Sequence, residues 1–138
     1  MDQLVEFADN NRLLFLTLLA SWAGVMFYEM KLKATTLAQV STTDAVRMIN
    51  KGAIIIDVRP DGEYEAGHIV NAKNITLGAI QADQDVNKKK NRLLLTVCEN
   101  GVSSNKAVNL LRKAGFENAF SLKGGLRQWR TDNMTLIK

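Results

Sequence analysis

Few of the residues that build disulfide frameworks and zinc sites are present in this sequence. Its 138 residues include one cysteine, Cys98, and one histidine, His68. A single cysteine excludes an internal disulfide framework and fits a reducing compartment. Structural zinc sites take four cysteine or histidine ligands, often from CxxC pairs, so we expect no metal site. Nothing in the sequence indicates another cofactor.

Basic residues are not concentrated in the way that nucleic-acid-binding proteins require. The chain has 18 Lys and Arg against 14 Asp and Glu, a net charge of +4. The only basic run is KKKNR at residues 88–92, and no aromatic residues alternate with it. We therefore expect no nucleic acid partner and interpret this run as a solvated loop before a buried strand. The length leaves room for one folded domain, and 46% hydrophobic residues argue against extensive disorder.

The N-terminal segment departs from this globular composition. Residues 13–28, LLFLTLLASWAGVMFY, are sixteen residues without a charge, and their apolar side chains occupy every face of a helix. A membrane span needs about twenty residues, and a snorkelling Arg12 together with residues up to Met30 brings the length close to that. The acidic flank before the segment is atypical of a secretory signal peptide, which starts with positive charge. The sequence therefore predicts one transmembrane helix.

The predicted organisation is a short tail over residues 1–11, a transmembrane helix over 12–30, a linker over 31–39 and a domain over 40–138. Lys31 and Lys33 follow the span, whereas acidic residues precede it. The positive-inside rule then places the domain in the cytoplasm and the N-terminus outside, in a single-pass protein of the inner (plasma) membrane. The bilayer is thus one expected partner, and a membrane-protein partner stays open.

Short apolar runs alternate with helical patterns along the domain, which predicts an α/β fold. Strands are expected over residues 53–56, 72–75, 93–97 and 118–122, and helices over parts of 41–51, 61–66, 103–114 and 126–129. The polar segment 78–92 is expected to be a loop. Continuous β-branched runs are typical of buried parallel strands, so we predict a five-stranded parallel sheet with helices on both faces.

The stretch LLLTVCENGVSS at residues 93–104 combines a strand, the cysteine, a glycine and two serines at the start of a helix. Loop amides and a helix N-terminus stabilise a negative sulfur, so Cys98 is a candidate nucleophile. A buried cysteine that packs as a small hydrophobe is the alternative. Asp57 and Arg59 follow the strand at 53–56 and are expected at the same edge of the sheet, where α/β proteins form sites. They could equally form a structural ion pair.

Three segments of the domain resemble the rhodanese family. DVRPDGEYEAGHIVNAKNI at residues 57–75 follows the family pattern D-x-R-x-x-x-E-[FY]-x-x-G-H-I-x-x-A-x-N-[IL]. CENGVSS at 98–104 resembles the active loop, and LKGGLRQW at 122–129 resembles the closing L-x-G-G-[LFM]-x-x-W. An N-terminal anchor with one such domain is similar to small membrane-bound bacterial members.

The resemblance implies that a cysteine thiolate takes up sulfane sulfur as a persulfide and passes it to a second nucleophile. Cys98 would be the catalytic residue, and Asp57, Arg59 and His68 would support the loop. The substrate-binding loop would consist of Glu99, Asn100, Gly101, Val102, Ser103 and Ser104. The expected partners are a sulfur donor (thiosulfate, polysulfide or a protein persulfide) and a thiol or other nucleophilic acceptor.

Two loop positions depart from the family pattern. Ser103 stands where many single-domain members have an arginine, and Glu99 stands where several thiosulfate-using members have a basic residue. A carboxylate at the loop mouth should repel thiosulfate, which predicts weak thiosulfate turnover and favours a persulfide or protein-borne donor. Because the sixth residue after Cys98 is Ser104, the loop also lacks the arginine of cysteine phosphatases. The alternative function is a non-catalytic rhodanese-like interaction module at the membrane.

Overall fold

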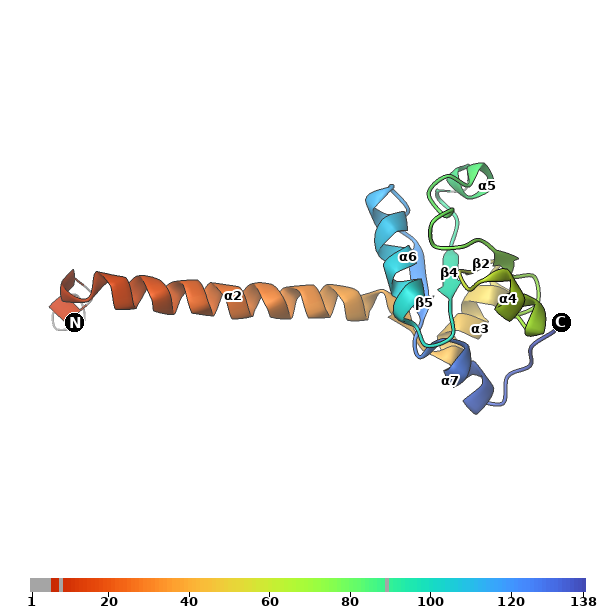
Figure 1. Cartoon of the computed structure of the whole chain (residues 1–138), viewed down its shortest axis with the longest axis horizontal. Coiled ribbons are helices and arrows are strands. Elements are labelled where there is room, and N and C mark those ends of the chain that lie inside the picture. The colour runs from red at the N-terminus through yellow and green to blue at the C-terminus, as the bar shows by residue number, and fades with distance from the viewer. Residues whose placement is uncertain (1–5, 8, 89) are drawn as a thin grey trace. The chain divides into compact units, whose positions relative to one another are not determined.

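The computed structural model describes residues 6, 7, 9–88 and 90–138, and it divides into the compact units Met1–Thr36 and Leu37–Lys138 (Figure 1). Most of the predicted tail, residues 1–5 and 8, lies outside the described residues. Within the second unit, every described β-strand pairs in parallel with its neighbours.

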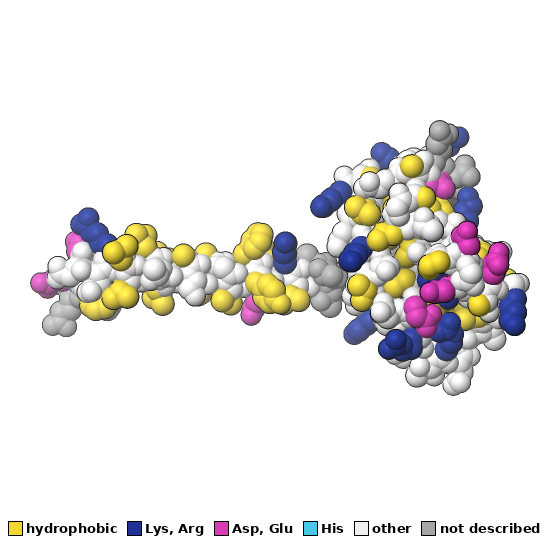
Figure 2. Space-filling view, viewed as in Figure 1, with side chains coloured by type: hydrophobic (Ala, Val, Ile, Leu, Met, Phe, Trp, Pro, Cys, Tyr) yellow, Lys and Arg dark blue, Asp and Glu magenta, His cyan; other side chains and the backbone are white. Residues whose placement is uncertain are grey.

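The first unit is dominated by helix α2 (Arg12–Leu37). From Arg12 to Lys33 its side chains are exposed, and large apolar side chains appear along the visible face in Figure 2. By length and composition, the 22 residues from Arg12 to Lys33 can cross a membrane. The structure differs from the predicted linker over 31–39, because α2 continues through Leu37 and Gln39 begins a strand.

The second unit is built on the predicted five-stranded parallel sheet, with strand order β1-β5-β4-β2-β3. Its strands are β1 (Gln39–Val40), β2 (Ile54–Asp57), β3 (Lys73–Asn74), β4 (Leu94–Val97) and β5 (Ala119–Leu122). The sequence analysis placed strands at β2 to β5 and missed β1, whose two residues are too few to show a pattern. Strand β4 lies at the centre, paired with β2 and β5.

Helices cover both faces of this sheet, as predicted. They are α3 (Thr42–Asn50), α4 (Asp61–Ala66), α5 (Gln84–Asn87), α6 (Val102–Lys113) and α7 (Gly125–Thr131). Neighbouring strand residues face opposite sides, so Ile56 and Leu94 belong to one apolar cluster with α6, whereas Ile55 and Leu95 belong to another with α3 and α7. Burial on both faces explains why the strands are continuously apolar.

The segment 78–92 is more ordered than the predicted loop. It contains the short helix α5, and Ile80 and Val86 are fully buried in the core cluster on the α6 face. Two large apolar residues in a mostly polar stretch have no helical or strand period, so the sequence pattern did not reveal this packing.

Three adjacent strands end at the same edge of the sheet and deliver the predicted site residues there. Strand β2 leads into Val58 and Arg59, β4 leads directly into Cys98, and β5 leads into Gly124 and Gly125. In parallel α/β sheets this carboxyl edge is where binding and catalytic sites form. The site therefore assembles around the end of the central strand.

Candidate functional site

Cys98 lies at the end of β4 with its sulfur inside a cradle of backbone amides. The N–H of Gly101 donates to Cys98 Sγ at 3.0 Å and the N–H of Ser104 at 3.3 Å, and the thiol is 3.4 Å from Ser104 Oγ. Cys98 is 3% exposed. Donors aimed at one sulfur stabilise its negative form, whether thiolate or persulfide. The geometry therefore fits both roles considered for Cys98, a nucleophile and a buried residue that packs as a small hydrophobe.

The turn after Cys98 is shaped by Gly101, which caps α6. Gly101 has φ +92°, a left-handed conformation that favours glycine, and a Cβ there would lie 3.3 Å from the backbone nitrogen of Gly124. Asn100 Oδ1 accepts a hydrogen bond from the N–H of Val102 at 3.0 Å. Helix α6 begins at Val102, so the serines predicted to start it lie inside its first turn. Ser103 is half-buried there, and Val102 is exposed.

Behind the loop lies a group of buried hydroxyls that the sequence analysis did not identify. Ser104 Oγ is 2.7 Å from Ser121 Oγ of β5 and donates to the carbonyl of Gly101 at 3.2 Å. Thr96 Oγ1 donates to the carbonyl of Ser104 at 3.0 Å. Ser104, Ser121 and Thr96 are fully buried. These bonds join the first turn of α6 to β4 and β5, and so hold the loop in place.

The double glycine Gly124–Gly125 allows close approach to the loop. Gly125 has φ +63°, and a Cβ there would lie 2.6 Å from the carbonyl carbon of Glu99. The N–H of Leu126 donates to the carbonyl of Cys98 at 2.8 Å, and that of Arg127 donates to the carbonyl of Glu99 at 3.0 Å. The first turn of α7 thus satisfies the loop carbonyls.

Asp57 and Arg59 form a buried ion pair beside the loop. Arg59 Nη2 lies 2.8 Å from Asp57 Oδ2 and donates to the carbonyl of Gly67 at 2.7 Å, while Nε donates to Asp57 Oδ1 at 3.0 Å. Burial by itself lowers the pKa of Arg59, but its hydrogen bonds to Asp57 and the charges of Asp57, Glu99 and Glu63 outweigh this, so the pKa is raised. The pair joins the end of β2 to Gly67 after α4, and a structural ion pair is one of the two roles considered from the sequence.

His68 ties backbone segments together. Its Nδ1 is 3.0 Å from the carbonyl of Tyr64, and the two rings stack with centroids 3.9 Å apart. Its N–H and carbonyl both pair with Ile137, each at 2.8 Å, in an isolated antiparallel bridge. The ring therefore supports the turn after α4, and the C-terminal segment is held against that turn.

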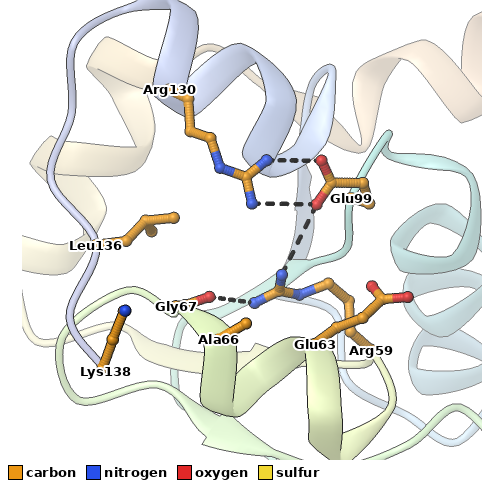
Figure 3. A pocket seen from close by; sticks show the side chains of 8 residues that line it. All are labelled: Arg59, Glu63, Ala66, Gly67, Glu99, Arg130, Leu136 and Lys138. Atoms are coloured by element: carbon orange, nitrogen blue, oxygen red, sulfur yellow. Dashed lines mark hydrogen bonds and ion pairs between the residues drawn. The ribbon is translucent and has the colours of Figure 1, made fainter.

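Beside the loop lies a cavity of about 460 Å³, drawn in Figure 3. It is lined by Arg59, Glu63, Ala66, Gly67, Glu99, Arg130, Leu136 and Lys138. Glu99, the carboxylate expected to repel thiosulfate, is paired with two arginines. Its Oε1 lies 2.6 Å from Arg130 Nη1, and its Oε2 lies 3.7 Å from Arg59 Nη1. The sequence analysis missed Arg130, although its place after the closing L-x-G-G-[LFM]-x-x-W segment was a usable signal.

Comparison with known families agrees with this geometry. The rhodanese-like domain family matches residues 41–132, which include the amide cradle, the buried ion pair and the double glycine. The chain belongs to the rhodanese-like sulfurtransferase family. Over its whole length it is similar to protein YibN of Escherichia coli strain K12, with 26% identity over 141 residues that cover 100% of this chain and 99% of that protein.

The rhodanese-like domain alone is similar to proteins named for sulfur transfer. Thiosulfate sulfurtransferase GlpE of Coxiella burnetii is 32% identical over 98 residues, covering 70% of this chain and 91% of GlpE. The human single-domain sulfurtransferase TSTD1 superposes with a TM-score of 0.60 and 26% identity, covering 68% of this chain and 96% of that structure. A rhodanese-related protein from Thermoplasma volcanium gives a TM-score of 0.64 at 23% identity, covering 72% and 96%.

Proposed function

We propose that this protein is a membrane-anchored sulfurtransferase that carries sulfane sulfur as a persulfide on Cys98. The amide cradle supports this most directly, because the N–H groups of Gly101 and Ser104 point at the sulfur. The sulfurtransferase names of GlpE and TSTD1 support the reaction class.

In the proposed cycle, the Cys98 thiolate attacks the sulfane sulfur of a donor. A new S–S bond forms on Cys98, the bond between the sulfane sulfur and the rest of the donor breaks, and the leaving group departs with the electron pair. A thiol or other nucleophile then attacks the outer sulfur of the persulfide and regenerates the Cys98 thiolate. The cradle amides stabilise the negative sulfur before the first step and after the second.

Intact mass spectrometry of the full-length chain in detergent tests this proposal. After exposure to thiosulfate or polysulfide we expect a gain of about 32 Da, one sulfur atom, that a reductant reverses. Cys98→Ser should show no gain. Absence of the adduct with every donor would contradict the catalytic proposal.

A second candidate is a non-catalytic interaction module. Two observations favour it: Cys98 is 3% exposed, and Ser103 brings no charge to the loop. The mass experiment separates the two functions, because a module with an idle cysteine would take up no sulfur.

We propose that residues 12–30 of α2 anchor the protein in the inner (plasma) membrane, with the N-terminus outside and the rhodanese-like domain in the cytoplasm. The exposed apolar surface of α2 and the flanking Lys31 and Lys33 support this orientation. Membrane pelleting of the full-length chain, compared with a variant lacking residues 1–30, tests attachment. Cleavage of the domain by protease added outside intact cells would contradict the orientation.

A further inference from the structure

The cavity beside the cysteine loop is lined by the exposed ion pair of Glu99 and Arg130. We propose that Arg130 is the residue that recognises an anionic sulfur donor such as thiosulfate, and that Glu99 competes with the donor for it. This inference rests on the proposed sulfurtransferase function and assigns the donor-specificity residues of the same site.

The charges that line the cavity favour an anion once Glu99 is displaced. Three cationic side chains, Arg59, Arg130 and Lys138, line it together with the carboxylates of Glu63 and Glu99. Two of the cations converge on Glu99, as the dashed lines in Figure 3 show. Without the Glu99 charge, three cations and one carboxylate line the cavity, and Asp57 already pairs with Arg59 from behind, so one positive charge is left in excess.

The contacts of the two arginines differ, and they leave Arg130 rather than Arg59 available to bind an anion. Arg59 is 4% exposed, and its Nε and Nη2 are held by Asp57 and Gly67, so only Nη1 faces Glu99. Arg130 donates from Nη1 to Glu99 Oε1 at 2.6 Å and from Nη2 to Oε2 at 3.4 Å. A two-oxygen acceptor on a guanidinium fork is also how a sulfonate group binds arginine.

The Glu99–Arg130 pair can open at little cost to folding. The two side chains are 41% and 47% exposed, and ion pairs this exposed contribute little to stability. Glu99 follows Cys98 directly in the chain, and through Glu99 the loop borders the cavity that Arg130 lines. The Cys98 thiolate would attack the sulfane sulfur of thiosulfate, forming the persulfide bond, while the S–S bond of thiosulfate breaks and sulfite leaves with the electron pair.

The rate of sulfur loading by thiosulfate measures this competition in the full-length chain in detergent. Each rate is divided by the rate of alkylation by iodoacetamide, an uncharged reagent that reports only the reactivity of Cys98. We expect Glu99→Gln to raise this ratio about tenfold, because one unit charge near the bound dianion is removed. Glu63→Gln is the matched control, since it removes the same charge from the same cavity without freeing Arg130, and its gain should be several-fold smaller.

Combining Glu99→Gln with Arg130→Gln distinguishes competition for Arg130 from simple repulsion. If Glu99 occupies Arg130, the gain from Glu99→Gln shrinks in the Arg130→Gln background, because no guanidinium is released there. If Glu99 only repels the donor, the gain is at least as large in that background, because Arg130 no longer offsets the Glu99 charge. The second outcome would overturn the inference.

Loading by polysulfide separates failure of this inference from failure of the proposed function. An unchanged thiosulfate ratio in Glu99→Gln, with normal loading by polysulfide, would overturn the role of Glu99 and leave the sulfurtransferase intact. Absence of sulfur on Cys98 with both donors would overturn both.

Discussion

The buried pair of Asp57 and Arg59 should be the most sensitive point of the domain to a single substitution. Asp57 is fully buried and Arg59 is 4% exposed, and Asp57 also accepts the N–H of Arg59 at 3.0 Å. Asp57→Asn leaves a buried guanidinium without its counter-charge. Breaking a buried pair in this way costs about 3–5 kcal/mol, a large part of the roughly 5–15 kcal/mol that stabilises a typical domain.

Urea unfolding followed by tryptophan fluorescence measures this loss. Trp129 is 3% exposed in the core of the domain, whereas Trp22 is exposed on α2, so a Trp22→Phe background isolates the domain signal. The matched control is Glu99→Gln, which removes one half-exposed carboxylate that lies 2.6 Å from the half-exposed Arg130 and only 3.7 Å from Arg59, with Asp57 left in place. It should cost less than about 1 kcal/mol. Equal losses in Asp57→Asn and Glu99→Gln would refute the reasoning from burial.

The pH dependence of the same pair follows from the raised pKa of Arg59. A basic group with a raised pKa in the folded state contributes stability that is fully present below its unfolded pKa and is lost only above it. Since the pKa of arginine is ordinarily far above neutral pH and is raised further here, the contribution should persist up to about pH 10. This assignment would be contradicted if the difference in the free energy of unfolding between wild type and Asp57→Asn disappeared between pH 7 and pH 10.

Two further pairs of substitutions, each a test with its control, examine how the loop is held. Gly125→Ala should lower sulfur loading at least about tenfold, because its Cβ meets the backbone of Glu99, whereas Gly115→Ala, at φ +97° with open space around it, keeps loading near the wild-type rate. Ser121→Ala should lower the free energy of unfolding by about 1 kcal/mol through the lost bond to Ser104, and Ser103→Ala by less than about 0.5 kcal/mol. Equal effects within either pair would contradict the contacts described.

Much of the fold follows from local sequence patterns. Continuous apolar runs such as 53–56 predict buried parallel strands because both faces of each strand are covered, and the alternation with helical segments predicts the α/β class. Ser41 caps α3 through the N–H of Asp44, and Gly115 follows α6 with a positive φ, and both residue types are typical of these helix ends. These features depend on residues close together in the chain.

Chain-local patterns were insufficient where contacts join distant segments. Strand β1 has two residues and pairs with β5, more than eighty positions away, so no local period reveals it. Ile80 and Val86 are buried by the core around them rather than by a pattern of their own. The length of α2 also exceeds the apolar segment, because its polar continuation to Leu37 stays helical.

The sequence by itself determined the candidate nucleophile and its immediate loop, because Cys98, Gly101 and Ser104 are within seven residues and the cradle amides belong to that stretch. Only the tertiary structure decided which charged side chains meet in the cavity. Glu99 and Arg130 are 31 positions apart, and they meet because β4 and β5 are neighbours and α7 begins against the loop. Electrostatic interaction depends on distance in space, so a carboxylate with no cation near it in the sequence can still form an ion pair in the folded domain.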